Sequence, residues 1–403
     1  MKQQKRPLGL YLHIPFCRQK CRYCDFYSLP QKEERIDEYV QALTAHLIEV
    51  APRAAQHTVD TVYFGGGTPT YLSVKQLKSL LGTVQKHYTL TKDAEITFEA
   101  NPDSAGDFRT LRALRRAGFN RISIGMQSAV DEELQAVGRI HDFSQVQAAV
   151  EAARKAKITN ISLDLIYGLP EQTMESFKHS LAAAVSLAPT HISCYGLKLE
   201  PGTPLFREQD SLTLADDDGQ ADMYLYAVEY LQQNGYFQYE ISNFAKPGFE
   251  SRHNLKYWTL SEYAGFGPGS HSDFGGVRYS FHADLQAYID GVLHGAPMPL
   301  DREDLPDWPR DTEYLMLRLR TTAGIDPRFF ENTYRRHFSA LLPLFQQYEQ
   351  MGLAELSETG FWHFTPKGFL LSNTLIGSLL DALSADKQRR LEATQRGDFH
   401  IRL

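Results

Sequence analysis

The chain has 403 residues, of which 42% are hydrophobic and 23% charged, values typical of a soluble globular protein with a large core. This length exceeds one minimal domain and fits a large barrel domain with a smaller appendage. The net charge of −7 at pH 7 argues against a general nucleic-acid binder, and the lack of an apolar stretch of about 18 residues argues against a transmembrane helix.

The first part of the chain alternates strand-like and helix-like segments. Apolar and β-branched runs predict strands over residues 8–14, 59–65, 95–100, 121–125, 160–166 and 191–197. Helical spacing predicts helices over residues 33–51, 73–87, 107–117, 131–137, 144–157 and 174–187. Repeated strand–helix units predict a parallel sheet with right-handed crossovers, here an open, partial (β/α)6 barrel.

The pattern changes after the sixth strand. A long helix is predicted over 216–235 and a strand over 237–244, followed by a segment rich in glycine and aromatic residues. Proline and aspartate gather over 297–309, which predicts a linker. Helices over 312–320 and 338–351, and a hairpin of 354–356 with 362–365, predict a winged-helix-like end. The predicted domains are therefore a barrel core (1–235), a barrel extension (236–300) and a C-terminal helical, winged-helix-like domain (301–403).

Three of the four cysteines fall within one segment, Cys17-Arg-Gln-Lys-Cys21-Arg-Tyr-Cys24. A secreted disulfide scaffold would spread its cysteines, so clustered thiols without an export signal predict a metal site in a reducing, cytoplasmic compartment. Three thiolates on one loop suit three irons of a cubane 4Fe–4S cluster and leave the fourth iron open to a ligand. The alternative is a zinc site, with His13 as the nearby candidate for a fourth ligand.

Polar residues also stand where the predicted strands end. Gly65-Gly66-Gly67-Thr68-Pro69 follows the second strand, where glycines let the backbone approach a ligand and free N–H groups bind polar atoms. Barrel enzymes build their sites at the carboxyl ends of the strands. One ligand pocket is therefore predicted around Glu99, Gln127, Arg139 and Asp164, although each residue alone is as well explained as a core polar group or a cap.

This C-x3-C-x2-C loop, directly after a first strand, resembles the radical S-adenosylmethionine (SAM) superfamily. The resemblance implies a 4Fe–4S cluster on Cys17, Cys21 and Cys24, with SAM chelating the open iron through its amino and carboxylate groups; the radical chemistry belongs to the cofactor. It also implies the contacts of SAM: Gly66, Gly67 and Thr68 near its amino group, Glu99 and Arg139 near its charged methionyl end, Gln127 and Asp164 near its ribose, and Tyr11 and Tyr23 packed against SAM and the cluster.

Longer motifs resemble one branch of that superfamily, the oxygen-independent coproporphyrinogen III oxidases and the related heme chaperone family HemW. They are His13-Ile-Pro-Phe-Cys17, Gly65-Gly-Gly-Thr-Pro69 and Tyr167-Gly-Leu-Pro-Glu-Gln-Thr173. Three features favour HemW: Phe26 stands where the oxidase has an additional cysteine, the segment before the first strand is short, and His253-Asn254-Leu-Lys-Tyr257-Trp258 matches the H-N-x-x-Y-W motif.

The resemblance implies a heme chaperone that binds heme and delivers it to an acceptor protein, without an assigned catalytic residue. His253 is the expected axial ligand of heme, since a neutral imidazole ligates heme iron and the neighbouring aromatic rings stack on a porphyrin. The alternative is a buried structural histidine. His271 and His282 are candidates for secondary ligands, and Cys194 is expected to act as a small hydrophobe in its strand. The expected partners are heme, a membrane-associated acceptor, a low-potential electron donor and a second copy of the chain, with no nucleic acid.

Two other functions stay open. One is coproporphyrinogen III oxidase activity, a radical oxidative decarboxylation, which Phe26 and the short first segment disfavour. The other is a radical SAM enzyme acting on RNA or protein, which the acidic charge balance disfavours; copurifying nucleic acid with steeply salt-dependent binding would revive it.

Overall fold

The computed structural model describes residues 5–305 and 310–395, which divide into two units. The first unit contains the chain up to Phe237, together with Ser242–Lys256 and Ser261–Leu305. The second contains Gln238–Ile241, Tyr257–Leu260 and the chain after Leu305.

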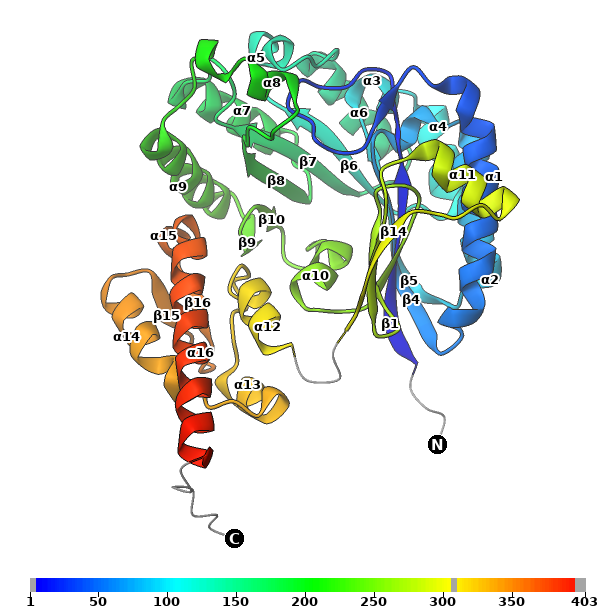
Figure 1. Cartoon of the computed structure of the whole chain (residues 1–403). Helices are drawn as coiled ribbons and strands as arrows, with labels where there is room; N and C mark the ends of the chain where they lie inside the picture. Colours follow the sequence, from blue (N-terminus) through cyan, green and yellow to red (C-terminus); the bar gives the residue numbers. More distant parts are fainter. Residues whose placement is uncertain (1–4, 306–309, 396–403) are drawn as a thin grey trace. The chain divides into compact units, whose positions relative to one another are not determined.

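Six strands of the first unit are parallel and lie side by side in chain order (Figure 1). They are β1 (Arg6–Ile14), β4 (His57–Gly66), β5 (Leu90–Ala100), β6 (Arg121–Gln127), β7 (Asn160–Tyr167) and β8 (His191–Gly196). The predicted fold class, a partial barrel of six strand–helix units with a helical C-terminal region, is confirmed.

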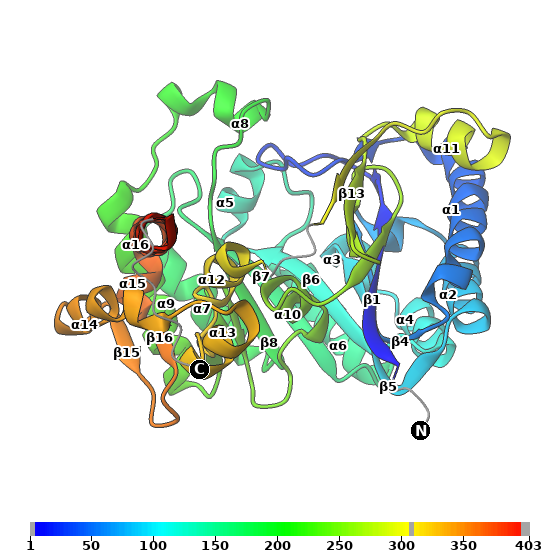
Figure 2. The same cartoon turned by 60° about the horizontal axis from the view of Figure 1, so that its bottom comes forward.

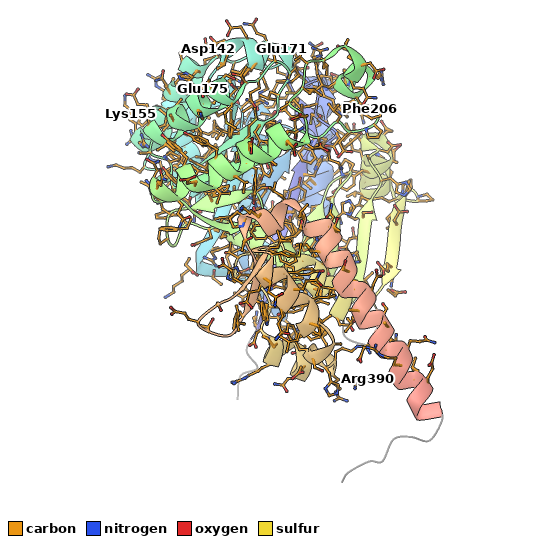
Figure 3. All side chains as sticks on the ribbon, turned by 90° about the vertical axis from the view of Figure 1, so that its left-hand side faces the viewer. Asp142, Lys155, Glu171, Glu175, Phe206 and Arg390 are labelled. Carbon is orange, nitrogen blue, oxygen red and sulfur yellow. The ribbon has the colours of Figure 1, made fainter. Side chains whose placement is uncertain are left out.

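Helices connect these strands and cover the outer side of the curved sheet (Figure 2). Several begin at a side chain that accepts backbone N–H bonds, for example Ser73, Asp142 and Thr173. Asp142 and Lys155 lie at the two ends of α6, at the surface of this helical layer (Figure 3). The helices and turns are η1 (Glu33–Arg35), α1 (Ile36–Val50), η2 (Ala51–Ala54), η3 (Pro69–Tyr71), α2 (Val74–His87), α3 (Pro102–Ala105), α4 (Phe108–Ala117), α5 (Asp131–Ala136), α6 (Phe143–Lys155), α7 (Met174–Ser186), α8 (Pro204–Arg207), η4 (Gln209–Ser211) and α9 (Asp217–Gln233).

Residues along the parallel strands alternate between an apolar and a polar environment. On β1, Leu8, Leu10 and Leu12 are fully buried, as expected for side chains packed under the helices. The alternate residues on the other strands are polar and face the interior of the barrel, among them Tyr63, Glu99, Arg121, Ser123, Asp164 and Ser193. Cys194 belongs to the apolar set of β8; it is a buried free thiol, as predicted.

The sheet continues beyond β1 through β11 (Tyr263–Phe266), β12 (His271–Phe274), β13 (Val277–Phe281) and β14 (Leu300–Asp304). The β11 strand is parallel to β1, and the three after it are antiparallel. The linker predicted over 297–309 is therefore wrong at β14, because each of its residues pairs with a residue of β13. Residues 306–309 of that linker lie outside the described residues. The helix α11 (Leu285–His294) follows β13.

At the opposite edge, β10 (Asn243–Ala245) pairs antiparallel with β8. The single strand predicted over 237–244 is instead two strands, β9 (Phe237–Glu240) and β10, which are separated by a turn. The short helix α10 (Arg252–Trp258) follows and carries the H-N-x-x-Y-W motif.

The described part of the second unit after Leu305 consists of helices and one hairpin, in agreement with the predicted helical C-terminal region. Its aromatic core includes Phe330, Phe345 and Trp362. Its elements are α12 (Asp311–Arg318), α13 (Pro327–Tyr334), η5 (Phe338–Ala340), α14 (Leu342–Gln350), β15 (Ala354–Leu356), β16 (Trp362–Phe364), α15 (Pro366–Leu370) and α16 (Ser372–Gln395). Across the described residues of both units, no helix has the length and hydrophobicity needed to cross a membrane.

Candidate functional site

The cysteine segment forms a closed loop directly after β1. The short strands β2 (Phe16–Cys17) and β3 (Leu29–Pro30) pair in parallel and hold the two ends of the loop together. Within it, the amide of Cys24 donates to the carbonyl of Cys21 at 3.2 Å. Cys17 is buried, Cys21 and Cys24 are half-buried, and all three are free thiols. Burial raises the pKa of the Cys24 thiol to about 11.

The loop is also held against the segment between α5 and α6. Gln19 Nε2 donates to the carbonyl of Gly138 at 3.0 Å, and the Arg22 guanidinium donates to the carbonyl of Ala136 at 2.7 Å. The amide of Arg22 donates to the carbonyl of Val137 at 3.0 Å. The cysteines therefore have a fixed position relative to Arg139, which follows in this segment.

A cavity of about 390 Å3 opens beside the three cysteines, on the polar side of the barrel. Its lining combines the cysteine loop with residues at the ends of β4, β5, β6, β7 and β8, as predicted for a site at the carboxyl ends of parallel strands. It brings together the three cysteines and eight of the ten other predicted site residues: Tyr23, Gly66, Gly67, Thr68, Glu99, Gln127, Arg139 and Asp164.

The glycine segment after β4 connects three parts of this site. The amides of Gly67 and Thr68 donate to the carbonyls of Ile14 and Phe16, both at 2.8 Å. A Cβ atom on Gly67 would lie only 2.8 Å from those two carbonyl oxygens. The amide of Gly66, whose φ is +108°, donates to Glu99 Oε2 at 3.0 Å. The free N–H groups expected of this segment are thus engaged within the protein, so the glycines serve close backbone approach instead.

Thr68 and Arg139 contact the cysteines directly. Thr68 Oγ1 lies 3.3 Å from Cys17 Sγ and accepts a hydrogen bond from Asn101 Nδ2 at 3.0 Å. The Arg139 guanidinium donates to Cys21 Sγ at 3.4 Å and to Asn101 Oδ1 at 2.9 Å. The Arg139 charge also opposes the rise in the pKa of the Cys17 thiol that burial causes.

Two carboxyl groups of the cavity wall are buried and lie on different strands. Glu99 accepts hydrogen bonds through both oxygens, and burial raises its pKa to about 7, against the lowering effect of the hydrogen bond from Tyr63. Burial also raises the pKa of Asp164, which hydrogen bonds from Ser193, Ser123 and Ser162 counteract.

Gln127 lies at an irregularity of the sheet. The pairing of β6 with β7 shifts between Gly125 and Gln127, and the φ of Gln127 is +65°, in the left-handed region that few non-glycine residues adopt. Backbone strain of this kind is typical of functional sites. The shift leaves Gln127 in the lining of the cavity.

Tyr23 and Tyr11 occupy different places. Tyr23 lines the cavity and packs against a buried cluster of Val137, Ile166 and Leu169. Tyr11 is not among the described residues that line the cavity; its hydroxyl lies 3.1 Å from His13 Nδ1, and its ring stacks on Tyr63 at 6.1 Å between centroids.

His253 is also outside the lining of the cavity, whereas its neighbour Asn254 is part of it. The imidazole is 1% exposed, its Nδ1 lies 2.8 Å from Thr61 Oγ1, and its ring stacks on Tyr63 at 5.1 Å. Burial, with the nearby Lys256 and Arg121 charges, lowers its pKa to about 3. The motif is divided between the units, since Tyr257 and Trp258 belong to the second.

The other histidines considered lie apart from the cavity lining. His271 and His282 are exposed, and His282 Nε2 lies 3.2 Å from Asp301 Oδ1. His13, the candidate zinc ligand, has both ring nitrogens in hydrogen bonds, to Tyr11 and to the carbonyl of Tyr27. Within residues 5–305 and 310–395, no three His, Cys, Asp or Glu side chains are grouped to hold one metal ion. A cubane cluster distributes its thiolates over different irons and needs no such single-ion cage.

Several lining residues were not predicted. These residues are on the inner faces of their strands and precede the carboxyl ends: Tyr63, Arg121, Ser123 and Ser193. The alternation of polar and apolar residues was the signal that could have identified them. His141 was also not predicted, although it supports the site from outside the cavity lining. Burial and Arg139 lower its pKa to about 4, so its neutral Nδ1 accepts from Arg139 at 3.4 Å and its Nε2 donates to the carbonyl of Met126 at 3.1 Å.

Comparison with known proteins gives similarity over almost the whole chain. The model of the Radical SAM superfamily matches residues 11–184, and that of the HemN C-terminal domain matches residues 306–371. The chain is 37% identical to the heme chaperone HemW of Bacillus subtilis (strain 168) over 377 residues, covering 93% of this chain and 99% of that protein. It is 36% identical to the heme chaperone HemW of Escherichia coli (strain K12) over 382 residues, covering 92% and 97%.

One solved structure is similar along the same length. The radical SAM enzyme coproporphyrinogen III oxidase (HemN) from Escherichia coli has a TM-score of 0.79 and 26% sequence identity to this chain. The match covers 94% of this chain and 91% of that one.

Proposed function

This chain belongs to the HemW family of radical SAM proteins, and we propose that it is a heme chaperone, which binds heme and passes it to an acceptor protein. The observation that carries the proposal is the identity of 36–37% to HemW chaperones over nearly the full length of both chains. The cavity beside Cys17, Cys21 and Cys24 supports a working radical SAM site in the same chain.

The cysteine loop fits a 4Fe–4S cluster. Three free thiols on one loop, closed by β2 and β3, would hold three irons, and the open fourth iron would face a cavity in which a ligand has room. When bound, the cluster and SAM supply one-electron chemistry that side chains alone do not provide. The protein contributes binding, orientation and the exclusion of water around that site.

SAM would occupy the cavity, and the assignments of its contacts are proposals. The part of the lining that contains Glu99, Gly66, Gly67, Thr68 and Arg139 suits the charged methionyl end. Gln127 and Asp164 lie on β6 and β7 and suit the ribose, and Tyr23 would pack beside the cluster. Tyr11 would act indirectly, through its stacking on Tyr63, because it does not line the cavity.

His253 is proposed as the axial ligand of heme, and its burial means that it must become exposed before it can bind iron. Its lowered pKa keeps the imidazole neutral, the form that ligates iron. At 1% exposure the ring has to leave Thr61 and Tyr63 before it reaches a porphyrin, so ligation requires α10 to move.

The test of this ligand compares two buried histidines in heme titrations followed by the Soret band. His253→Ala is expected to weaken binding and to change the spectrum of the axially ligated heme. His191→Ala removes a buried imidazole bonded to Ser162 at 2.8 Å and serves as the matched control, which should keep the wild-type spectrum. Unchanged affinity and spectrum in His253→Ala would exclude the ligand role.

Oxidase activity is the second candidate, favoured by the structural similarity to coproporphyrinogen III oxidase. Phe26, which stands where the oxidase is expected to carry an additional cysteine, lines the cavity and is 64% exposed. The deciding experiment uses protein purified anaerobically with its cluster reconstituted. Stoichiometric heme binding without consumption of coproporphyrinogen supports the chaperone, whereas turnover with SAM cleavage and no heme binding overturns it.

The finer partners are also proposals from the family. A membrane-associated heme acceptor and a low-potential electron donor would complete the transfer, and the cluster would favour a homodimer. Mass measurements in solution before and after cluster reconstitution test the dimer directly, because the proposal requires the mass to double on reconstitution.

A further inference from the structure

Tyr63 contacts both Glu99, a residue of the proposed SAM site, and His253, the proposed heme ligand. It belongs to the inner face of β4 and lines the cavity. Its ring lies 6.1 Å from that of Tyr11 and 5.1 Å from that of His253, and those two rings lie 6.4 Å from each other, so the three form one compact cluster. Its hydroxyl donates a hydrogen bond of 2.7 Å to Glu99 Oε1. Contacts with two neighbouring rings restrict the Tyr63 side chain, so its hydroxyl donates to Glu99 from a fixed position and orients the carboxyl group.

The neighbouring glycine makes room for this pair. A Cβ atom on Gly65 would lie 2.8 Å from Tyr63 Cε1 and 3.0 Å from the carboxyl carbon of Glu99. The second carboxylate oxygen accepts from the amide of Gly66 at 3.0 Å. Both oxygens of Glu99 are thus held by donors on β4, and Glu99 itself lines the cavity. Each carboxylate oxygen has a further lone pair with which it can accept a second hydrogen bond.

We propose that Tyr63 is a positioning residue for SAM: it holds the Glu99 carboxyl group oriented toward the amino group of the bound cofactor. The inference rests on the proposed assignment of Glu99 to SAM. An ionised carboxylate accepts hydrogen bonds from an amino group, and such charge-assisted bonds are stronger than neutral ones.

The electrostatics of Glu99 give the sign of the effect. Burial raises its pKa to about 7, Tyr63 and the Gly66 amide lower it, the Asp164 charge raises it, and Arg121 lowers it. Loss of the Tyr63 hydroxyl therefore raises the pKa of Glu99 further and leaves a smaller fraction of Glu99 ionised at neutral pH. SAM affinity should rise with pH through the pKa of Glu99, and that rise should move to higher pH in Tyr63→Phe.

The experiment measures SAM binding by calorimetry across a pH series, on anaerobic protein with its cluster reconstituted. Tyr63→Phe keeps the stacked ring and removes only the hydroxyl. A rise of about one unit in the pKa of Glu99, from about 7, corresponds to about fivefold weaker binding at neutral pH and about tenfold at lower pH, with the difference shrinking at higher pH. Comparison with wild type at each pH cancels the titration of SAM itself. Tyr88→Phe is the matched control, since it loses a 2.7 Å bond from a buried phenol to the carbonyl of Leu47, away from the cavity.

A double-mutant cycle with Glu99→Gln separates the possible failures. If Tyr63 acts through Glu99, Tyr63→Phe adds no further loss in the Glu99→Gln background. An equal loss in both backgrounds, or a loss without a pH shift, overturns the positioning role and makes Tyr63 a packing residue. If Glu99→Gln itself leaves SAM affinity unchanged, the assignment of Glu99 to SAM fails instead. Melting curves of the four proteins confirm that each is folded.

Discussion

Arg139 contacts three parts of the site. Its guanidinium donates to Cys21 Sγ at 3.4 Å, to Asn101 Oδ1 at 2.9 Å and to the carbonyl of Gly125 at 2.7 Å. The planar fork of an arginine makes such simultaneous contacts, which a lysine does not reproduce. Through these bonds Arg139 connects the cysteine loop to the ends of β5 and β6.

The charge of Arg139 should be measurable in the reduction potential of the reconstituted cluster. A nearby positive charge and a hydrogen bond to sulfur stabilise the reduced, more negative cluster. Arg139→Gln is therefore expected to make the potential more negative, by on the order of tens of millivolts. Arg18→Gln is the control: it lies on the same loop but is exposed, and it pairs with Asp103. A redox titration followed by electron paramagnetic resonance that gave equal potentials for both variants would contradict this role.

The polar residues at the strand ends were predictable because parallel strands place those ends at one edge. The buried position of His253 was not predictable in this way, since the motif specifies residue types but not whether α10 folds against the barrel. Its burial depends on partners far away in the sequence, including Thr61 and Glu95. The same holds for Tyr63, whose role depends on Glu99 and His253.

At the level of the element, acidic side chains of β4 and β5 bind the helix α10. The carboxylate of Glu95 accepts from the amides of Arg252, at 3.2 Å, and His253, at 3.0 Å. Lys256, which is 5% exposed, pairs with Asp60 at 2.7 Å. The first unit thus holds the helix in the closed position in which His253 is buried.

Weakening this attachment should make His253 easier to release. Glu95→Gln replaces a buried charged acceptor and is expected to lower the free energy of unfolding by about 1–3 kcal/mol. If His253 ligates heme, the variant should also bind heme faster in stopped-flow measurements. Asp93→Asn is the matched control, because its exposed contact with Arg252 contributes little. A destabilised Glu95→Gln protein with unchanged heme association would mean that α10 does not control access to His253.

The parallel strands were predictable because each is a short apolar or β-branched run between helical segments. The antiparallel strands from β12 to β14 were not, since they are short and β14 is exposed along its length. A strand such as β14 exists through backbone pairing with a neighbour rather than through burial. The helix α16 was missed for a similar reason: its buried residues, Leu375, Ile376, Leu379 and Leu383, lie in its first half, and the rest carries no apolar pattern.

At the scale of the whole molecule, the first unit contains buried histidines that are neutral when folded. Burial lowers the pKa of His13, His46 and His141 to about 4 and that of His253 to about 3, and it lowers that of His191 as well. In the unfolded chain each has a pKa near 6.5. Below that value the unfolded state binds more protons, so stability falls as the pH drops toward the folded-state pKa.

The two carboxyl groups with raised pKa values change the stability in the opposite direction to the histidines. Glu99 and Asp164 bind protons more readily in the folded state, so their contribution is present at low pH and is lost as the pH rises through the folded-state pKa. Five histidines outnumber two carboxyl groups, so the net result is a loss of stability between about pH 6.5 and 4. Each histidine adds a slope of up to about 1.4 kcal/mol per pH unit in that range.

A pair of histidine variants tests this account in protein that has not been reconstituted with the cluster. His46 is 5% exposed, and its Nδ1 lies 2.8 Å from the hydroxyl of Tyr288, whereas His282 is exposed. Urea unfolding of the first unit is followed by hydrogen exchange of peptides from α1 at a series of pH values. His46→Gln should reduce the dependence of stability on pH by about one proton, whatever its effect on stability at neutral pH. His282→Gln should leave that slope unchanged. Equal slopes in wild type and His46→Gln would mean that His46 binds its proton equally well in the folded and unfolded protein, and that burial does not keep it neutral.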